Sequence, residues 1–481
     1  MKNIKIYILV VLVFTLSCDD KLNIEPRQVL DSDLVWVNEE NLEAVLFGAY
    51  AGMKGTFGNN EGGEMYGGDY MVFSEMLAAT DEVVWGGSFT AYREVFDKEI
   101  TVTNTAISLN WIRAYDVINS VNNVLAHLDL AETDEKRDWI EGQALAIRGI
   151  MYFELLRFWA QPYGTGSEVS DPGVPLVLTP TITVEDADAL MEQGRSTVAA
   201  GYQQVLDDLL EAKGLIDVSY GKNGTSISTY TVSAVLSRVY LQRGEFALAA
   251  QEADRVIQSG EYTLGDDPIK AFNNVSNGPE DVFTIQQTAL SNSGTSNGGL
   301  ATFYARLFGS GRGDVQVQAT HFTNYETGDL RSGLQDDLSD EATAGTVTEM
   351  YYIGVGGQNS GQIQCAKYQD SERNIQIVRL PEMYLTRAEA NFEAGTNVGA
   401  TPLADINAIR NRAGLTDLTT VTIDEIRLER MRELAFEGHK LHDIKRWQMS
   451  VGSLPYDANE LVLPIPQREI EIYDIPQNAG Y

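Results

Sequence analysis

Trp85 has sequence neighbours unlike those of the other five tryptophans. It follows the segment 80–82 (Thr-Asp-Glu) and precedes 86–88 (Gly-Gly-Ser), outside any helical pattern. An indole beside two glycines is expected to be exposed. It could then stack on a ligand with apolar C–H faces, while Asp81 or Glu82 accepts hydrogen bonds from hydroxyl groups. The alternatives are that Trp85 only anchors its own loop and that the carboxylates cap the next helix.

Five further aromatic rings and one arginine could extend such a site. Two tyrosines lie in or beside the glycine-rich segment 61–69, and the other candidates belong to loops in the second half of the chain. Long irregular loops in a compact domain are often functional, although ordinary hydrophobic anchoring is the alternative for each ring. The candidates are Tyr66, Tyr70, Phe303, Tyr304, Phe308 and Arg312.

Metal and cofactor chemistry finds little support in the sequence. His439 and His442 have an H-x-x-H spacing, but no third ligand belongs to a recognisable motif, so we interpret them as structural histidines. The acidic segment 336–341 lacks the spacing of a calcium loop and is interpreted as solvated charge. No motif of a serine hydrolase, zinc protease, P-loop protein or kinase occurs. We therefore expect neither a metal nor a cofactor.

The N-terminus has the features of an export signal. Lys2 and Lys5 begin the mostly apolar stretch that continues over 6–16. This run is too short to span a hydrocarbon core of ~30 Å, but it suits the apolar part of a signal peptide. We predict a signal peptide over 1–17.

Cys18 follows the predicted cleavage point, where a lipoprotein signal places its lipidated thiol. We predict lipidation of Cys18, with 18–32 as a tether because this segment has no hydrophobic periodicity. A disulfide with Cys365, the second of two cysteines, is the alternative. Lipidation would leave Cys365 unpaired and buried.

Composition and charge exclude some classes of protein. The chain has 481 residues, of which 43% are hydrophobic, and its 22 Tyr and 16 Phe indicate a folded protein. With 35 Lys and Arg against 69 Asp and Glu, the formal charge is -34. Because nucleic acids are bound through clustered cations, nucleic-acid binding is excluded. Beyond the signal, no apolar stretch reaches the ~18 residues of a transmembrane helix.

Helical periodicity dominates the chain, and strand alternation is scarce. The remaining tryptophans lie in or beside apolar stripes and are expected in the core; they are Trp36, Trp111, Trp139, Trp159 and Trp447. The predicted helices cover Glu39–Met53, Ile107–Leu128, Glu135–Trp159, Ser196–Leu215, Val232–Arg243, Phe246–Ser259, Leu380–Ala394, Ala404–Ala413 and Ile423–Met449.

Two helix pairs resemble tetratricopeptide hairpins. In 232–259, Gly244 relieves a turn before Phe246 and a stripe of small alanines, and 380–413 follows a similar pattern. Such repeats stack on their neighbours, so we predict a mostly α protein with tetratricopeptide-like helical repeats, little β structure and a loop-rich ligand-binding face.

We divide the mature chain into three regions. They are a helical region over 33–261, a loop-rich ligand-face region over 262–379 and a second helical region over 380–481.

Ordered motifs from the signal to the C-terminus resemble the SusD/RagB family of surface lipoproteins. The motifs are Arg148-x-x-x-Tyr152-Phe153-x-Leu-Leu-Arg157, Gly173-Val-Pro-Leu176, Gly328-Asp-x-Arg331, Arg379-Leu-Pro-Glu-Met-Tyr-Leu-Thr-Arg-Ala-Glu-Ala390, Asn407-Ala-Ile-Arg-Asn-Arg-Ala-Gly-Leu415, Glu429-Arg-x-x-Glu-Leu-Ala-Phe-Glu-Gly438, Asp443-Ile-Lys-Arg-Trp447, Leu463-Pro-Ile-Pro466 and Gln477-Asn-x-Gly-Tyr481. The resemblance implies tetratricopeptide-like repeats, anchoring in the outer membrane facing the cell exterior, and capture of oligosaccharide or polysaccharide. It also implies a partner, a SusC-like TonB-dependent transporter that this protein would cover as a lid.

The family motifs themselves are interpreted as scaffold. Charged side chains spaced three and four apart suit ion pairs on a helix, each worth only tenths of a kcal/mol if exposed. These residues are Glu429, Arg430, Arg432 and Glu433, while Arg446 and Trp447 could stack on or cap neighbouring repeats. The resemblance places the ligand face on an early loop and on loops of the second half, without supplying the exact residues.

Three other functions remain open. A surface glycoside hydrolase needs only two carboxylates ~5–9.5 Å apart, which 69 acids would satisfy by chance. Some family members look adapted to peptides, so a peptide-binding lipoprotein is the main alternative. A repeat scaffold that binds only protein is another. We expect a non-catalytic glycan-binding protein.

Overall fold

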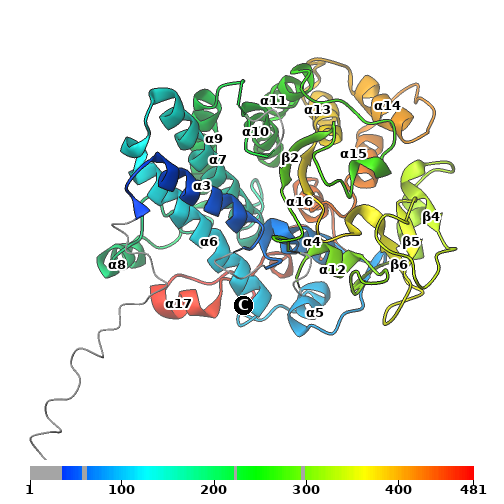
Figure 1. Ribbon diagram of the computed structural model, residues 1–481, viewed down its shortest axis with the longest axis horizontal. Helices are drawn as coiled ribbons and strands as arrows, with labels where there is room; N and C mark the ends of the chain where they lie inside the picture. The colour runs from blue at the N-terminus through cyan, green and yellow to red at the C-terminus, as the bar shows by residue number, and fades with distance from the viewer. Residues whose placement is uncertain (1–34, 57–61, 221–224, 294–297) are drawn as a thin grey trace, which may run out of the picture.

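The computed structural model describes residues 35–56, 62–220, 225–293 and 298–481. The described chain is mostly helical with little β structure, as predicted (Figure 1). Eight of the nine predicted segments are helices whose ends lie within a few residues of the expected ones: α3 (Glu39–Met53), α6 (Thr105–Ala126), α7 (Asp134–Trp159), α9 (Val198–Leu215), α10 (Thr229–Arg243), α11 (Phe246–Gln258), α13 (Leu380–Ala394) and α14 (Pro402–Arg412). The predicted signal peptide, Cys18 and the tether lie outside the described residues.

Local sequence sets the ends of the two predicted hairpins. The Ser228 hydroxyl accepts a hydrogen bond from the backbone N–H of Thr231 at 3.0 Å and caps α10, which ends at Gly244 with φ 72°. Gly395, with φ 65°, ends α13 in the same way, and Thr401 caps α14. Only glycine adopts this left-handed conformation at no steric cost. Both segments are therefore helix–turn–helix units, with α10 packed on α11 and α13 on α14.

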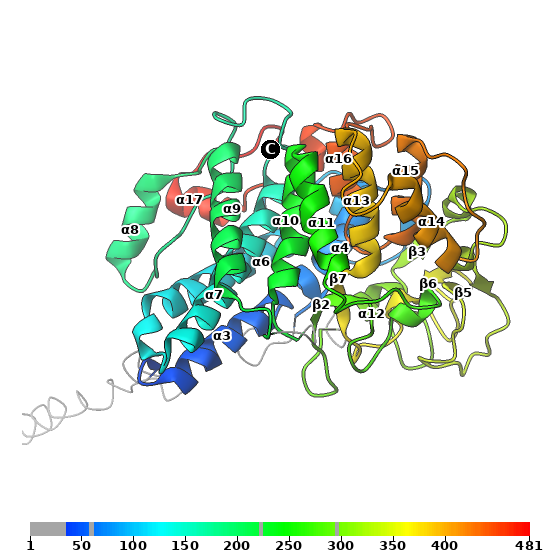
Figure 2. The ribbon, with the colours of Figure 1, turned by 90° about the horizontal axis from the view of Figure 1, so that it is seen from above.

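The long helices pack in succession. Contacts connect α3 to α6, α6 to α7, α7 to α9, α9 to α10, α10 to α11 and α11 to α13. In Figure 2 the helices α9, α10, α11 and α13 stand side by side. Ala249, Ala250 and Ala253 of α11 are fully buried, and their small side chains let the neighbouring helices approach closely. This succession is the solenoid-like body expected from the repeat pattern.

The prediction of a single helix over Ile423–Met449 is wrong. The structure has two helices instead, α15 (Ile423–Glu433) and α16 (Lys440–Arg446). Between them, Phe436 and Gly438 have φ values of 67° and 81°, which an α-helix does not contain, so one continuous helix cannot pass through this segment. The cause is a tertiary contact with α4 (Asp69–Leu77), because a Cβ at Gly438 would lie 3.2 Å from the Met71 Cα.

Short strands link the first part of the chain to the second. A five-stranded sheet has the order β1-β3-β6-β5-β4, and β2 pairs with β7 in a separate ladder. Within the larger sheet only β4 and β5 are parallel. The strands are β1 (Val83–Trp85), β2 (Asp281–Ile285), β3 (Val315–Val317), β4 (Leu334–Gln335), β5 (Tyr351–Ile353), β6 (Ile363–Cys365) and β7 (Ile375–Arg379).

Several short helices were not predicted. The α-helices are α5 (Thr90–Asp97), α8 (Val184–Gln193), α12 (Leu300–Tyr304) and α17 (Gln467–Tyr473), in addition to α4. The 3₁₀ turns are Met65–Gly67, Leu128–Leu130, Ile269–Ala271, Ala319–Asn324, Leu330–Ser332, Ala366–Tyr368 and Asn459–Leu461. None of the helices in the described ranges is long and apolar enough to cross a membrane.

The core contains the side chains expected there. Trp111, Trp139, Trp159 and Trp447 are buried, and the partly buried Trp36 stacks on the His127 ring at 4.1 Å between centroids. Cys365 is buried, as predicted, and burial raises the pKa of its thiol to about 12. Its possible disulfide partner, Cys18, lies outside the described residues, so the unpaired state stays a prediction.

The charged residues of the family motifs form a buried ionic network rather than exposed pairs. Arg379, at the end of β7, pairs with Glu437 at 2.7 Å and with Glu433 and Glu280 at 3.2 Å. Although burial alone would raise the pKa of Glu433, Arg412 and the other cations around it hold that pKa below its usual range. The Trp447 indole N–H donates to Glu389 at 2.6 Å. The predicted scaffold role of these motifs is confirmed.

The C-terminal segment completes the core of the first half of the chain. The backbone N–H of Leu463 donates to the Phe158 carbonyl at 2.8 Å, and the Trp159 indole N–H donates to the Pro464 carbonyl at 3.0 Å. Asn478 donates to the Trp159 carbonyl at 2.8 Å. Residues 461–478 therefore cover the end of α7.

Candidate functional site

The early loop and the later loops lie together, as the family resemblance implied. Strand β1 pairs with β3 in antiparallel register, which places Trp85 opposite Val315. The backbones also cross closely, since a Cβ at Gly63 would lie 2.0 Å from the Gly298 carbonyl carbon. Glycine at position 63 permits this approach. Glycine at the crossing of the two backbones is therefore what lets the early segment and the later loop contribute to one site.

Trp85 is 1% exposed, so the expectation of an exposed indole is wrong. Its ring stacks on Tyr92 at 5.3 Å and meets Phe303 edge-on at 5.6 Å. The neighbouring glycine explains the burial, because a Cβ at Gly87 would lie 2.5 Å from the indole ring. The missing side chain lets the backbone lie against the indole. Trp85 thus anchors its own loop, the alternative weighed from the sequence.

Four other predicted site residues also lie in the core. Phe303 and Tyr304 are fully buried, and the Tyr304 ring packs against Tyr368 and Phe436. The Tyr66 hydroxyl donates to Glu154 at 2.6 Å. Tyr70 stacks on Phe158. These rings present no exposed platform, because neighbouring helices cover them.

Two of the predicted site residues in the later loops are accessible. Phe308 is 61% exposed, and the Arg312 side chain is one-third exposed. The Arg312 guanidinium pairs with Asp314 at 2.6 Å and lies 4.5 Å from the centroid of the Phe89 ring. An arginine over an aromatic ring gains a cation–π contact and is held in place for a ligand. Phe89 is half-buried and was not singled out from the sequence.

Phe89 also lines a cleft of about 460 Å³. We call it the Phe89 cleft; its walls include Gly63, Asp69, Tyr92, Leu109 and Gly298. The cleft therefore joins the early segment, α6 and the later loop, close to the aromatic cluster of Trp85 and Phe303.

A buried carboxyl group lies in the wall of this cleft. The Tyr92 hydroxyl and the Asn110 amide donate to Asp69 at 2.8 and 2.6 Å. Burial raises the pKa of Asp69 well above its usual range, despite these two hydrogen bonds. The neutral form that burial favours suits an uncharged polar ligand better than an ion.

Asp81 and Glu82 lie elsewhere. They line a second cleft of about 350 Å³, together with Lys440, which pairs with Glu82. Glu82 also accepts hydrogen bonds from Thr80, so its carboxylate closes a local turn. The structure does not bring these acids to the Phe89 cleft.

The sequence contained a signal for Phe89. The ring directly follows the Gly-Gly-Ser segment that had drawn attention to Trp85, but on its other side. Nothing local distinguished the two rings, because their exposure depends on the pairing of β1 with β3.

Among the residues that the structure describes, no group of three or more His, Cys, Asp or Glu could hold a metal ion. His439 and His442 are both buried.

A body of stacked helix pairs with a cleft built from loops defines a class of helical-repeat proteins, and comparisons identify the family within it. The chain belongs to the SusD/RagB family. The model of the SusD family matches residues 285–481, and a second model, described as starch-binding associating with outer membrane, matches residues 31–241.

Individual relatives agree with this assignment. SusD-like protein P2 of Formosa agariphila is 25% identical over 540 residues, which cover 100% of both chains. Starch-binding protein SusD of Bacteroides thetaiotaomicron is 41% identical over 85 residues, 18% of this chain and 14% of that protein.

Solved structures show the same fold. A SusD superfamily protein from Bacteroides thetaiotaomicron has a TM-score of 0.75 at 23% identity, covering 92% of this chain and 100% of that one. A structure described as a laminarin binding SusD-like protein has a TM-score of 0.70 at 24% identity, with the same coverage. Two of these four names, starch-binding and laminarin binding, describe binding.

Proposed function

We propose that this protein is a non-catalytic, lipid-anchored glycan-binding protein of the outer membrane that captures oligosaccharides at the Phe89 cleft. It delivers them to a SusC-like TonB-dependent transporter, for which it acts as a lid. The observation that carries the binding proposal is the Phe89 ring, held under the Arg312 guanidinium at the edge of a cleft of about 460 Å³. The relatives named as starch-binding and laminarin binding support carbohydrate as the ligand class.

The cleft has the chemistry that a sugar requires. An aromatic ring contacts the apolar C–H face of a pyranose, while polar groups around it bond the hydroxyls. Phe89 supplies the ring, Arg312 supplies donors, and Asp69 supplies a carboxyl group that is not committed to an ion pair within the described residues. The formal charge of -34 also disfavours highly sulfated or polyuronic ligands.

The test is substitution of the ring. Full-length protein in detergent is screened on a glycan array and titrated with maltohexaose and laminarihexaose by calorimetry. Phe89→Ala is expected to weaken binding about ten- to hundredfold, or about 1–3 kcal/mol, as for aromatic anchors in other interfaces. Phe47→Ala is the matched control, because Phe47 is 50% exposed on α3 and does not line the cleft.

Two results would contradict this proposal. One is an unchanged dissociation constant in Phe89→Ala for a glycan that binds the wild type. The other is binding to a peptide array with no binding to any glycan, which would favour the peptide-binding alternative.

A further inference from the structure

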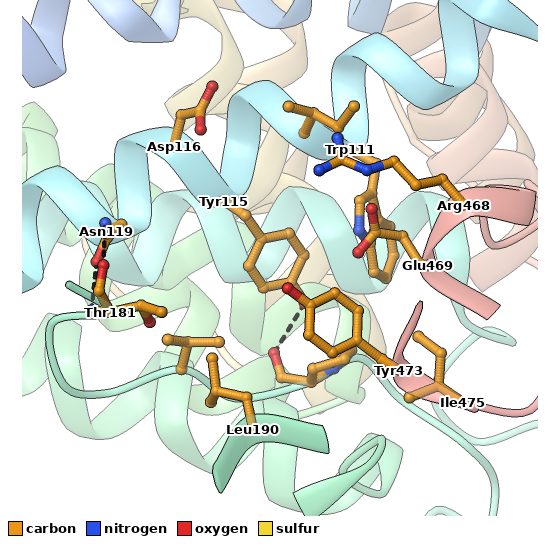
Figure 3. A pocket seen from close by; sticks show the side chains of 13 residues that line it. Trp111, Tyr115, Asp116, Asn119, Thr181, Leu190, Arg468, Glu469, Tyr473 and Ile475 are labelled. Atoms are coloured by element: carbon orange, nitrogen blue, oxygen red, sulfur yellow. Dashed lines mark hydrogen bonds between the residues drawn. The ribbon is translucent and has the colours of Figure 1, made fainter. Parts of the chain in front are cut away.

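A separate pocket of about 260 Å³ lies on the side of the molecule formed by α6, α8 and α17. Figure 3 shows Trp111 and Tyr115 reaching it from α6, and Tyr473 with Glu469 reaching it from α17. None of its lining residues lines the Phe89 cleft. The pocket is thus distinct from the site proposed above.

The walls of the pocket are fixed before any ligand arrives. The Tyr115 hydroxyl donates to the Pro175 carbonyl at 2.8 Å, which sets the plane of its ring. The same loop is held at Val177, whose carbonyl accepts hydrogen bonds from Tyr152 and Asn122, each at 2.8 Å. A preformed wall lowers the entropy cost of binding.

Two polar groups at the pocket are not committed to partners within the described part of the chain. Among the described residues, the Tyr473 hydroxyl and the Arg468 guanidinium make no hydrogen bond or ion pair, although Arg468 lies close enough to lower the pKa of two carboxyls. Those carboxyls belong to Asp116 and Glu469, and burial outweighs this effect and raises both pKa values. Donors and acceptors therefore surround the aromatic walls.

The carboxyl groups of the pocket have cationic neighbours. Arg113, which lies outside the lining, pairs with Asp116 at 3.2 Å, and Arg468 in the lining acts on Glu469, so each carboxyl group is offset by one guanidinium group. A balanced set favours a neutral ligand over an anion or a cation. The volume is just below the ~300 Å³ typical of the smallest drug-sized pockets, so the ligand is one or two rings in size.

We infer that this pocket is a second saccharide-binding site, which takes a neutral sugar ring between Tyr115 and Tyr473, with Glu469 and Arg468 bonding its hydroxyls. The combination of aromatic faces with carboxylate and guanidinium groups is the one that carbohydrate requires. The inference rests on the proposed function, because it takes the ligand class from there. It adds a second contact for the same chain of sugars, which would raise the avidity of capture.

The experiment compares variants of the two sites in full-length protein in detergent. Wild type is titrated with maltohexaose, laminarihexaose, glucose, galactose and mannose, with saturation-transfer NMR for the monosaccharides. Tyr473→Ala is expected to weaken binding of at least one of these sugars about tenfold. Phe89→Ala is expected to leave the affinity for that same sugar at this pocket unchanged. Tyr456→Ala is the control, because Tyr456 is also half-buried but does not line this pocket.

The outcomes separate the two proposals. Equal binding by Tyr473→Ala and wild type, with binding lost in Phe89→Ala, overturns the second site and leaves the proposed function standing. If the wild type binds none of the five sugars, the second site is overturned. If the wild type also binds no glycan on the array, the proposed function is overturned as well. If Tyr473→Ala lowers the melting temperature, Glu469→Gln becomes the deciding variant, because it leaves the aromatic wall of the pocket in place. Unchanged sugar affinity of Glu469→Gln then overturns the inference.

Discussion

At the scale of single residues, Glu75 is a carboxylic acid whose charge is poorly solvated. It lies near the end of α4, is 2% exposed and accepts a hydrogen bond from the Phe436 backbone N–H at 3.1 Å. Burial raises the pKa of Glu75 to about 7, and the positive charge of Lys440 offsets only part of this effect. The side chain therefore titrates close to neutral pH.

Glu75 should make stability depend on pH in a predictable direction. Its pKa in the folded state exceeds the usual 4.5, so the folded protein holds the proton more tightly than the unfolded chain does. Its contribution to stability is complete below pH ~4.5 and is lost as the pH rises through about 7. Glu75→Gln, which mimics the protonated form, should raise the free energy of unfolding at pH 8 by about 2–3 kcal/mol relative to wild type.

Urea denaturation at pH 5 and pH 8 measures this effect. The difference between Glu75→Gln and wild type should shrink at pH 5, where the wild-type side chain is already protonated. Glu135→Gln, an exposed carboxylate on α7, serves as the control and should change stability little at either pH. A difference that is the same at both pH values would show that Glu75 does not titrate in this range.

At the scale of elements, Arg379 connects three parts of the chain. It lies at the end of β7 and pairs with Glu280 before β2, with Glu433 at the end of α15 and with Glu437 between α15 and α16. Arg379→Met should lower the free energy of unfolding by about 3–5 kcal/mol, because it leaves buried carboxylates without their partner. Chemical denaturation checks this value.

The matched control for that experiment is Arg137→Met on α7. The Arg137 side chain is 45% exposed and pairs only with exposed acids, so its replacement should cost less than about 1 kcal/mol. Similar small losses in both variants would show that the buried network contributes no more than a surface pair.

The helices could be predicted from sequence because their causes are local. Caps such as Ser228 and turns such as Gly244 lie within a few residues of the ends that they set. The break between α15 and α16 could not be predicted in this way, since Gly438 is needed by a contact with Met71 from α4. Strands of two to five residues carry too little alternation to be recognised.

The candidate site was predicted only in outline. The family resemblance implied an early loop and later loops, and these lie together through the pairing of β1 with β3. Which ring faces the cleft depended on contacts from distant parts of the chain. Phe303 covers Trp85, whereas Phe89 reaches the cleft beneath Arg312.

At the scale of the whole molecule, the first prediction concerns anchoring. Cys18 lies outside the described residues, and its lipidation remains a prediction from the signal sequence. Cys18→Ala should move the protein from the membrane fraction to the soluble fraction without changing its melting temperature. Detergent-phase partitioning measures this shift, and unchanged attachment would refute the lipoprotein interpretation. Cys365→Ala is the control for general effects of removing a thiol.

The second prediction concerns the proposed transporter. Affinity purification of tagged, lipidated protein from its native membrane should recover a barrel protein in near-equal amount, because the lid role requires a stable complex. A lid that releases sugar into a confined volume raises its effective concentration to about millimolar, so weak binding of isolated glycan suffices. Recovery of the lipoprotein alone, while other outer-membrane complexes remain intact, would defeat the lid role even if glycan binding were confirmed.

The cover that residues 461–478 place over α7 has a consequence for biogenesis. Ribosomes make a protein from its N-terminus. Phe158 and Trp159 therefore lack their hydrogen-bond partners in residues 461–478 until almost all the helical pairs have been synthesised. The first half therefore cannot reach its final packing before the C-terminal segment has been made. Truncation shortly before residue 461 should therefore destabilise the first half of the chain as well, because it removes the cover over the end of α7.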